Sequence, residues 1–288
     1  MQCFYINLEQ ARARREQIEH GFQLHRTSDW TLCRFPALDT QYVRQRGIAG
    51  RIRDSEKACF ASHRELIRST LRDEHPIFVL EDDALLCGET FTTLDRHVCG
   101  EPQGSWDVTF TDVLFPDIPA MLELAGLRRE WRRRNHARRH PEFLFIDLAR
   151  VNFAGATAYL VQGRSKAKLV HWLESADSLD IPYDLFIRKL VHEGHLKARS
   201  IFPFITTLSP LAMSSQLQLS HDAAPNLVWN TFRRLMCLER DLGTQQAALA
   251  EILQRLCDEE SRAVGTIVAA MLSMQHGAEG QIPGQPVG

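Results

Sequence analysis

The stretch Pro76-Ile77-Phe78-Val79-Leu80-Glu81-Asp82-Asp83-Ala84-Leu85-Leu86 sets four apolar residues directly before three carboxylates. An apolar run without polar alternation predicts a buried central strand of a parallel sheet. Ligands of open α/β sheets gather at the carboxyl ends of such strands. Adjacent carboxylates repel each other unless they share a cation, and oxygen ligands favour Mg²⁺ or Mn²⁺, which also bridge nucleotide phosphates. The alternative is that Asp82 or Asp83 only caps a following helix.

Strand and helix patterns alternate on both sides of this strand. We predict strands at 3–6, 77–80, 108–110, 143–146, 156–161 and 199–202, and helices at 9–21, 54–73, 88–98, 165–175 and 181–191. Such alternation predicts an α/β protein with a parallel or mixed sheet.

Beyond Pro225 the apolar residues follow helical spacing only. The predicted organisation is a sheet domain at 1–222, a C-terminal helical appendage at 223–275 and a disordered tail at 276–288. The last helices have three alternative roles: covering the sheet, forming a homodimer or lying on a membrane surface.

Composition excludes several classes of protein. The net charge of -2 over 288 residues gives no global attraction to nucleic acid. No apolar run reaches the about 18 to 20 residues of a membrane span, and the first residues lack the pattern of a secretory signal. We therefore predict a cytoplasmic protein. The seven cysteines form no CxxC pair, so the spacing indicates neither a disulfide framework nor a zinc site.

One local block, from Arg128 to His140, is strongly basic and includes Trp131. It can bind a phosphorylated glycan, lipid head groups or another polyanion, which would hold the protein peripherally at the inner face of the membrane. The alternative is a solvated insertion without a ligand.

Six short blocks, in this order, resemble glycosyltransferase family 25, the bacterial lipopolysaccharide glycosyltransferases that are related to the collagen β-galactosyltransferase domain. The blocks are Phe4-Tyr5-Ile6-Asn7-Leu8 with Arg14-Arg15, Arg34-Phe35-Pro36-Ala37-Leu38-Asp39, Ser55-Glu56-Lys57-Ala58-Cys59-Phe60-Ala61-Ser62-His63, Leu80-Glu81-Asp82-Asp83, Gly155-Ala156-Thr157-Ala158-Tyr159-Leu160 and Ile181-Pro182-Tyr183-Asp184. The resemblance implies a GT-A-like nucleotide-sugar-binding fold, with a metal at the acidic strand end and an acceptor cleft formed by the C-terminal half.

The acidic strand end supplies the expected metal ligands. Asp83 is the expected direct ligand of Mn²⁺ or Mg²⁺, Glu81 lies close by, and His221 is a further candidate ligand. A cation held there stabilises the charge that develops on a departing diphosphate. Asp82 is a candidate contact to the ribose, the sugar or the metal.

The expected donor-binding residues precede the acidic strand in the sequence. Asn7, Arg14 and Arg15 follow the first strand, and arginine side chains suit phosphate oxygens. Ser62 and His63 lie on the predicted second helix and can face the donor. The alternatives are a solvated helix face for the two arginines and a structural role for His63.

The family implies an inverting transfer, which needs a base for the acceptor hydroxyl. We expect Asp184 to be this base, although it stands at the start of a helix, where an N-cap is the alternative. Asp112 and Asp147 are reserve candidates near other predicted strand ends.

These observations give one main hypothesis. The chain is expected to be a metal-dependent inverting glycosyltransferase that moves a hexose, galactose from UDP-galactose in the first instance, to a sugar hydroxyl of a lipopolysaccharide or other glycan precursor. The alternative is a catalytically silent relative that binds nucleotide or glycan and acts as an interaction module.

Overall fold

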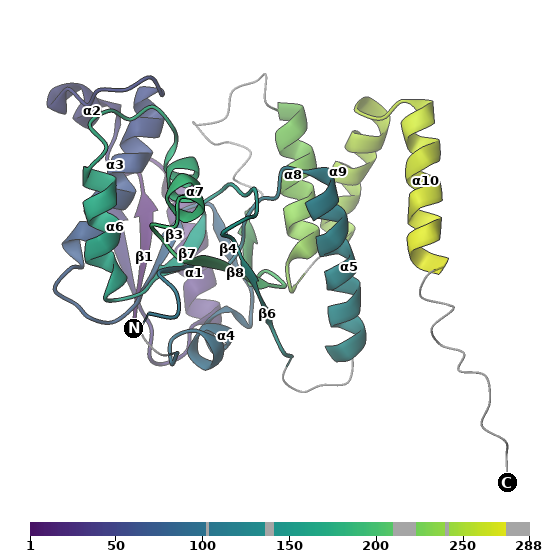
Figure 1. The fold of residues 1–288 in the computed structure, drawn as a ribbon, viewed down its shortest axis with the longest axis horizontal. Helices are drawn as coiled ribbons and strands as arrows, with labels where there is room; N and C mark the ends of the chain where they lie inside the picture. Colours follow the sequence, from purple (N-terminus) through teal and green to yellow (C-terminus); the bar gives the residue numbers. More distant parts are fainter. Residues whose placement is uncertain (102–103, 136–140, 210–222, 240–241, 275–288) are drawn as a thin grey trace, which may run out of the picture. The chain divides into compact units, whose positions relative to one another are not determined.

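The computed structural model describes residues 1–101, 104–135, 141–209, 223–239 and 242–274. The chain divides into two compact units, Met1–Arg240 and Asp241–Gly288, which are described separately. The first unit contains the sheets and the predicted site (Figure 1).

The first unit is built on a seven-stranded mixed sheet in the order β2-β1-β3-β7-β5-β8-β6. Its strands are β1 (Gln2–Asn7), β2 (Thr31–Pro36), β3 (Ile77–Glu81), β5 (Val108–Phe110), β6 (Leu144–Asp147), β7 (Ala158–Val161) and β8 (Ala198–Phe202). Strand β1 pairs in parallel with β2 and β3, whereas β7 runs antiparallel to both β3 and β5. The predicted α/β class with a mixed sheet is confirmed.

Strand β3 is buried on both faces, as its apolar run predicts. Ile77 and Val79 point into one hydrophobic cluster, and Phe78 and Leu80 point into the other, because successive side chains of a strand alternate between faces. All four side chains have no exposed surface. The acidic end of β3 therefore lies at an interior position of the sheet.

Helices cover both faces of this sheet (Figure 1). The cluster on the first face includes residues of α3 (Asp54–Ser69), α6 (Ser165–Glu174) and α7 (Tyr183–His192). The cluster on the second face includes residues of α1 (Arg12–His25) and α4 (Thr90–His97). A short helix, α2 (Thr40–Arg46), packs on α3 and is capped by the side chain of Asp39, which accepts a hydrogen bond from Tyr42 N.

The chain does not enter a helix after the three carboxylates. Asp82 and Asp83 form a turn between β3 and β4 (Ala84–Leu86), and β4 pairs antiparallel with β9 (Thr206–Leu208). The alternative that one of them caps a helix is therefore wrong. Sequence reasoning missed this two-stranded sheet.

Helix α8 (Ala223–Met236) belongs to the first unit, where it contacts β9 and α5 (Ile118–Asn135). The compact unit that contains the sheet extends to Arg240, and polar contacts hold α8 within it. Arg234 Nε, for example, donates to the carbonyl oxygen of Leu208 at 3.0 Å. A domain at 223–275 stays a prediction.

The second unit contains α9 (Leu242–Arg255) and α10 (Glu259–Met274), in the region where a helical appendage was predicted. Among the described residues, no helix combines the length and apolarity that a membrane crossing requires. The predicted tail at 276–288 lies outside the described residues.

Much of the basic block lies on α5, a helix that the sequence analysis did not predict. Arg128 is buried and donates hydrogen bonds to the carbonyl oxygens of Cys237 and Leu238, at 2.8 and 2.9 Å. Arg133 and Arg134 are exposed and pair with Glu130 of the same helix. Within the block, Arg128 therefore holds α5 to the segment after α8, whereas Arg133 and Arg134 face solvent. Residues 136–140 of the block lie outside the described part of the chain.

Candidate active site

A cavity of about 500 Å³ opens at the carboxyl ends of β1 and β3. Its walls come from the β1–α1 turn, the segment after β2, the first turns of α3 and the acidic turn. Among the predicted site residues the lining includes Arg14, Ser62, His63, Glu81, Asp82 and Asp83. Asn7 is buried and contacts Asp82 of this lining. Neither Arg15 nor Asp184 is among the lining residues.

Asp82 is held by two donors from the start of the chain. Asn7 Nδ2 donates to Asp82 Oδ2 at 2.7 Å, and Arg14 Nη1 donates to Asp82 Oδ1 at 3.1 Å. Asn7 is itself fixed, because its Oδ1 accepts from Arg34 Nε at 3.1 Å. Burial raises the pKa of Asp82, and the contacts with Asn7 and Arg14 oppose that rise. Both carboxylate oxygens of Asp82 are thus already engaged.

Glu81 pairs with His63 across the cavity floor. His63 Nε2 lies 3.2 Å from Glu81 Oε1, and His63 Nδ1 lies 2.8 Å from the hydroxyl of Tyr159. That hydroxyl is in turn 2.8 Å from the hydroxyl of Tyr183, whose ring stacks on the imidazole at 4.2 Å. Burial raises the pKa of Glu81, but the hydrogen bond with His63 and the electrostatic influence of His63, Arg233 and Arg14 together outweigh burial and lower it. This network fixes the ring of His63.

Asp83 differs from its two neighbours because one of its carboxylate oxygens has no hydrogen-bond donor among the described residues. Its Oδ1 is buried without a hydrogen-bond partner among the described residues, and its Oδ2 is 4.0 Å from Arg14 Nη1. Burial, followed by the negative charge of Glu81, raises the pKa of Asp83 from 3.8 to about 7. A buried oxygen without a partner costs about 1–3 kcal/mol. A divalent cation would supply that partner, so the residues present fit a metal.

Ser62 and Arg15 have mainly structural contacts. Ser62 Oγ donates to the carbonyl oxygen of Ala58 at 2.7 Å and accepts from Leu38 N at 2.8 Å, which ties α3 to the segment after β2. Arg15 Nε pairs with Glu19 at 3.2 Å on the partly exposed face of α1. The solvated-face alternative therefore describes Arg15 but not Arg14.

The candidate bases occupy three different environments. Asp184 does not cap its own helix; its Oδ2 accepts a hydrogen bond from Gly155 N at 2.7 Å. Asp112 is fully buried in an ion pair with Arg233, so its carboxylate is not available to an acceptor. Asp147 is exposed and accepts from Ala149 N in its own turn. His221 lies outside the described residues.

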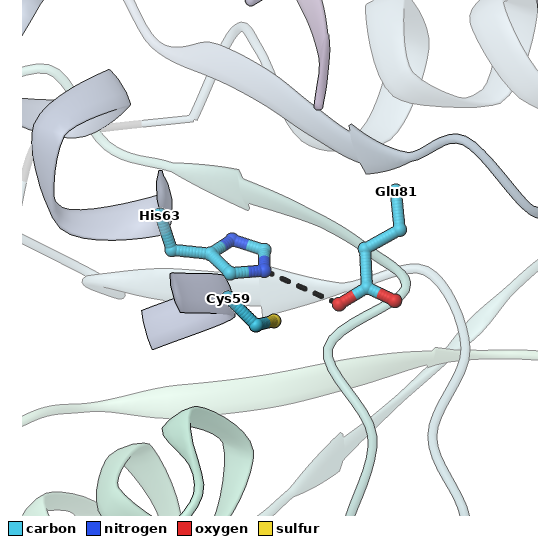
Figure 2. Close-up of side chains that lie close together, drawn as sticks. All are labelled: Cys59, His63 and Glu81. Atoms are coloured by element: carbon cyan, nitrogen blue, oxygen red, sulfur yellow. Dashed lines mark hydrogen bonds and ion pairs between the residues drawn. The ribbon is translucent and has the colours of Figure 1, made fainter. Parts of the chain in front are cut away.

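Two residues of this region were given no role by the sequence analysis. Arg233 of α8 is buried, lowers the pKa of both Glu81 and Asp83, and comes from a segment without any predicted motif. Cys59 lines the cavity one helical turn before His63, and Figure 2 shows both side chains facing Glu81. Burial, with Glu81 as the next cause, raises the pKa of the Cys59 thiol well above its usual range. The i, i+4 spacing of Cys59 and His63 was the signal that could have paired them.

Comparison with known proteins places this site in a wider context. The profile of the family described as "Glycosyltransferase family 25 (LPS biosynthesis protein)" matches residues 1–187, which carry the lining of the cavity. Among solved structures, the apo crystal structure of mouse xyloside xylosyltransferase 1 is similar at 10% identity and a TM-score of 0.34, over 68% of this chain and 70% of that chain. A search of curated proteins returned no match.

Proposed function

This chain belongs to glycosyltransferase family 25 and is a glycosyltransferase, and from that premise we propose that it transfers a hexose from a nucleotide sugar to a sugar hydroxyl of a lipopolysaccharide or other glycan precursor. UDP-galactose is the proposed donor. The observation that supports the proposal most directly is the cavity in which Asp83 keeps a buried oxygen without a hydrogen-bond partner among the described residues.

The size and lining of the cavity suit a nucleotide sugar. A volume of about 500 Å³ falls within the range of roughly 300–1,000 Å³ that is usual for small-molecule sites. Arg12 and Arg14 lie on its wall at the start of α1, where guanidinium groups suit a diphosphate. Since Asp82 already holds Arg14, the arginine is oriented before the donor binds.

We propose metal dependence because Glu81 and Asp82 have hydrogen-bond partners whereas Asp83 Oδ1 has none among the described residues. Asp83 is the proposed direct ligand of Mn²⁺ or Mg²⁺, with Glu81 and Asp82 beside it. A cation bound there would stabilise the negative charge that develops on the diphosphate leaving group. Asp82 keeps its contacts to Asn7 and Arg14, and Glu81 keeps its contact to His63. Those contacts hold the turn rigid while the donor binds.

An inverting transfer is proposed with Asp184 as the base. Its Oδ2 is held by the amide of Gly155, which fixes the carboxylate at the start of α7. In this proposal the carboxylate accepts the proton of the acceptor hydroxyl as the oxygen attacks the anomeric carbon. Asp112 is excluded from this role because its ion pair with Arg233 is fully buried.

The test is a turnover assay with intact nucleotide sugars. Purified protein with Mn²⁺ is incubated with a panel of UDP-hexoses and a lipopolysaccharide acceptor, and UDP release and the glycan product are both measured. Asp83→Ala should abolish product, whereas Asp177→Asn, which changes an exposed carboxylate outside the cavity lining, should not. No product with any donor, or full turnover in Asp83→Ala, contradicts the proposal.

The base is tested separately, with the anomeric configuration of the product as a second measurement. Asp184→Asn should lower kcat by about a hundredfold or more and leave the affinity for UDP unchanged. A product with the donor's own anomeric configuration, or a kcat that Asp184→Asn does not change, rules out the inverting mechanism through this residue.

A further inference from the structure

Three side chains of different chemistry meet on the floor of the cavity. The Sγ of Cys59, a ring nitrogen of His63 and a carboxylate oxygen of Glu81 all lie within 4.8 Å of one another (Figure 2). Cys59 and His63 are one turn apart on α3, and Glu81 ends β3. Thiolate, imidazole and carboxylate are the ligand types that hold zinc in proteins.

We propose that Cys59, His63 and Glu81 form a binding site for Zn²⁺ at the base of the donor cavity. The proposal concerns a second ion of softer type than the Mn²⁺ or Mg²⁺ proposed at Asp83, because a cysteine sulfur is a poor ligand for those hard cations. It stands on the arrangement of these side chains and does not depend on the transfer reaction.

The separation between the ligand atoms suits a tetrahedral ion. Zinc lies about 2.0–2.1 Å from imidazole nitrogen and about 2.0–2.2 Å from carboxylate oxygen, which sets these two atoms roughly 3.3 Å apart in a tetrahedron. His63 Nε2 and Glu81 Oε1 are 3.2 Å apart. The sulfur of Cys59 is within 4.8 Å of both ligand atoms, and in this proposal its side chain rotates to bring the thiolate to about 2.3 Å from the ion.

The surroundings of His63 also suit a metal ligand. Its Nδ1 contacts the hydroxyl of Tyr159 at 2.8 Å, and a partner on the second ring nitrogen commonly orients a zinc-bound histidine. Stacking on Tyr183 prevents the ring from turning away. Nε2 is therefore fixed toward Glu81 and the cavity before any ion arrives.

The fourth position of this site is open to the cavity. All three ligand residues are among the lining of the same space of about 500 Å³, so water or a ligand oxygen can complete the coordination. Glu81 also lies beside Asp83 and raises the pKa of that residue. Zinc bound to Glu81 therefore alters the charge next to the proposed Mn²⁺ position.

Cobalt provides a direct test, because Co²⁺ substitutes for zinc and its bond to a thiolate gives a charge-transfer absorption in the near ultraviolet. The full chain is reduced, stripped of metal with a chelator and titrated with Co²⁺, and Zn²⁺ is then added to displace it. We expect the thiolate band to saturate at one equivalent and to bleach with Zn²⁺. Absence of the band in the wild type overturns the proposal.

Variants identify the ligands. Cys59→Ser should remove the band and weaken Zn²⁺ binding at least about tenfold, and Glu81→Gln should weaken Zn²⁺ binding by a similar factor. Cys99→Ser is the matched control, since this partly exposed cysteine lies outside the cavity lining. Unfolding midpoints measured with chelator show that each variant is folded.

Two further variants separate this site from its alternatives. The sulfurs of Cys87 and Cys237 are 3.0 Å apart and form another place where a metal can meet thiols. A band that persists in Cys59→Ser and disappears in Cys87→Ser overturns the proposal. Asp83→Asn should keep the band even where it abolishes sugar transfer, and loss of the band in Asp83→Asn shows that there is no separate zinc site.

Discussion

Replacing Asp83 with asparagine removes a buried charge, and we predict that the metal-free variant is more stable than the wild type. The carboxylate has one oxygen without a hydrogen-bond partner among the described residues and lies next to the charge of Glu81. The rise of the Asp83 pKa from 3.8 to about 7 corresponds to a loss of about 4 kcal/mol in the free energy of unfolding when the group is ionised. That value is the upper limit of the gain, because asparagine keeps a polar amide in the same place.

The sign of the pH dependence follows from the raised pKa. Folded Asp83 holds a proton at pH values where the unfolded chain has released it, so the protonated group stabilises the folded state. This stabilisation is complete below about pH 4 and is lost as the pH rises to about 7. The wild type should therefore lose more stability than Asp83→Asn between those limits.

Urea unfolding followed by tryptophan fluorescence measures this difference. All five tryptophans lie within residues 1–240, so the signal reports the unit that contains the site. The proteins are compared in chelator at about pH 4.5 and about pH 8, with Asp177→Asn as the control. Parallel pH profiles of wild type and Asp83→Asn, or a less stable variant at the higher pH, would refute the reasoning. Added Mn²⁺ should reverse the order, since only the wild type then gains stability by binding.

Three further predictions concern the supports of the site. Arg233→Met should lower the free energy of unfolding by about 3–5 kcal/mol, because it leaves the buried carboxylate of Asp112 without its cation, and a smaller loss in the double variant with Asp112→Asn confirms the pairing. Gly163→Ala should cost at least about 1–3 kcal/mol in the same urea assay, since the added Cβ would lie 1.7 Å from the carbonyl oxygen of Glu74, and unchanged stability contradicts that reading. Arg14→Gln removes the charge that lowers the pKa of the two aspartates in the acidic turn, so the pH above which Mn²⁺ binds, followed by calorimetry, should rise, and an unchanged pH profile of binding refutes the role of Arg14.

Local patterns predicted the centre of the fold well. The apolar run at 77–80 indicated a buried strand, and it became β3, since four consecutive apolar side chains fit only where both faces of a sheet are covered. The GT-A-like α/β fold implied by the resemblance agrees with the observed mixed sheet. The predicted helix end at Gly21 was wrong, because helix α1 continues through it to His25. A glycine ends a helix through a positive φ, which Gly21 does not adopt.

Long-range pairings could not be predicted in the same way. Strand β4 forms only because β9, far along the chain, supplies its partner, and neither has a distinctive pattern. Arg233 is one of two adjacent arginines on α8, and only the folded chain shows that it meets Asp112. The zinc proposal has the same origin, since the cysteine spacing indicated no metal site and the third ligand, Glu81, comes from another element.

The three adjacent carboxylates have different hydrogen-bond partners in the folded chain. Asp82 accepts hydrogen bonds from Asn7 of β1 and Arg14 of α1, and Glu81 pairs with the imidazole of His63. Asp83 Oδ1 is left without a hydrogen-bond partner among the described residues. Stability alone would favour a neutral residue at that position. We propose that a cation binds Asp83 during function, because a buried acid without a donor is otherwise costly to the fold.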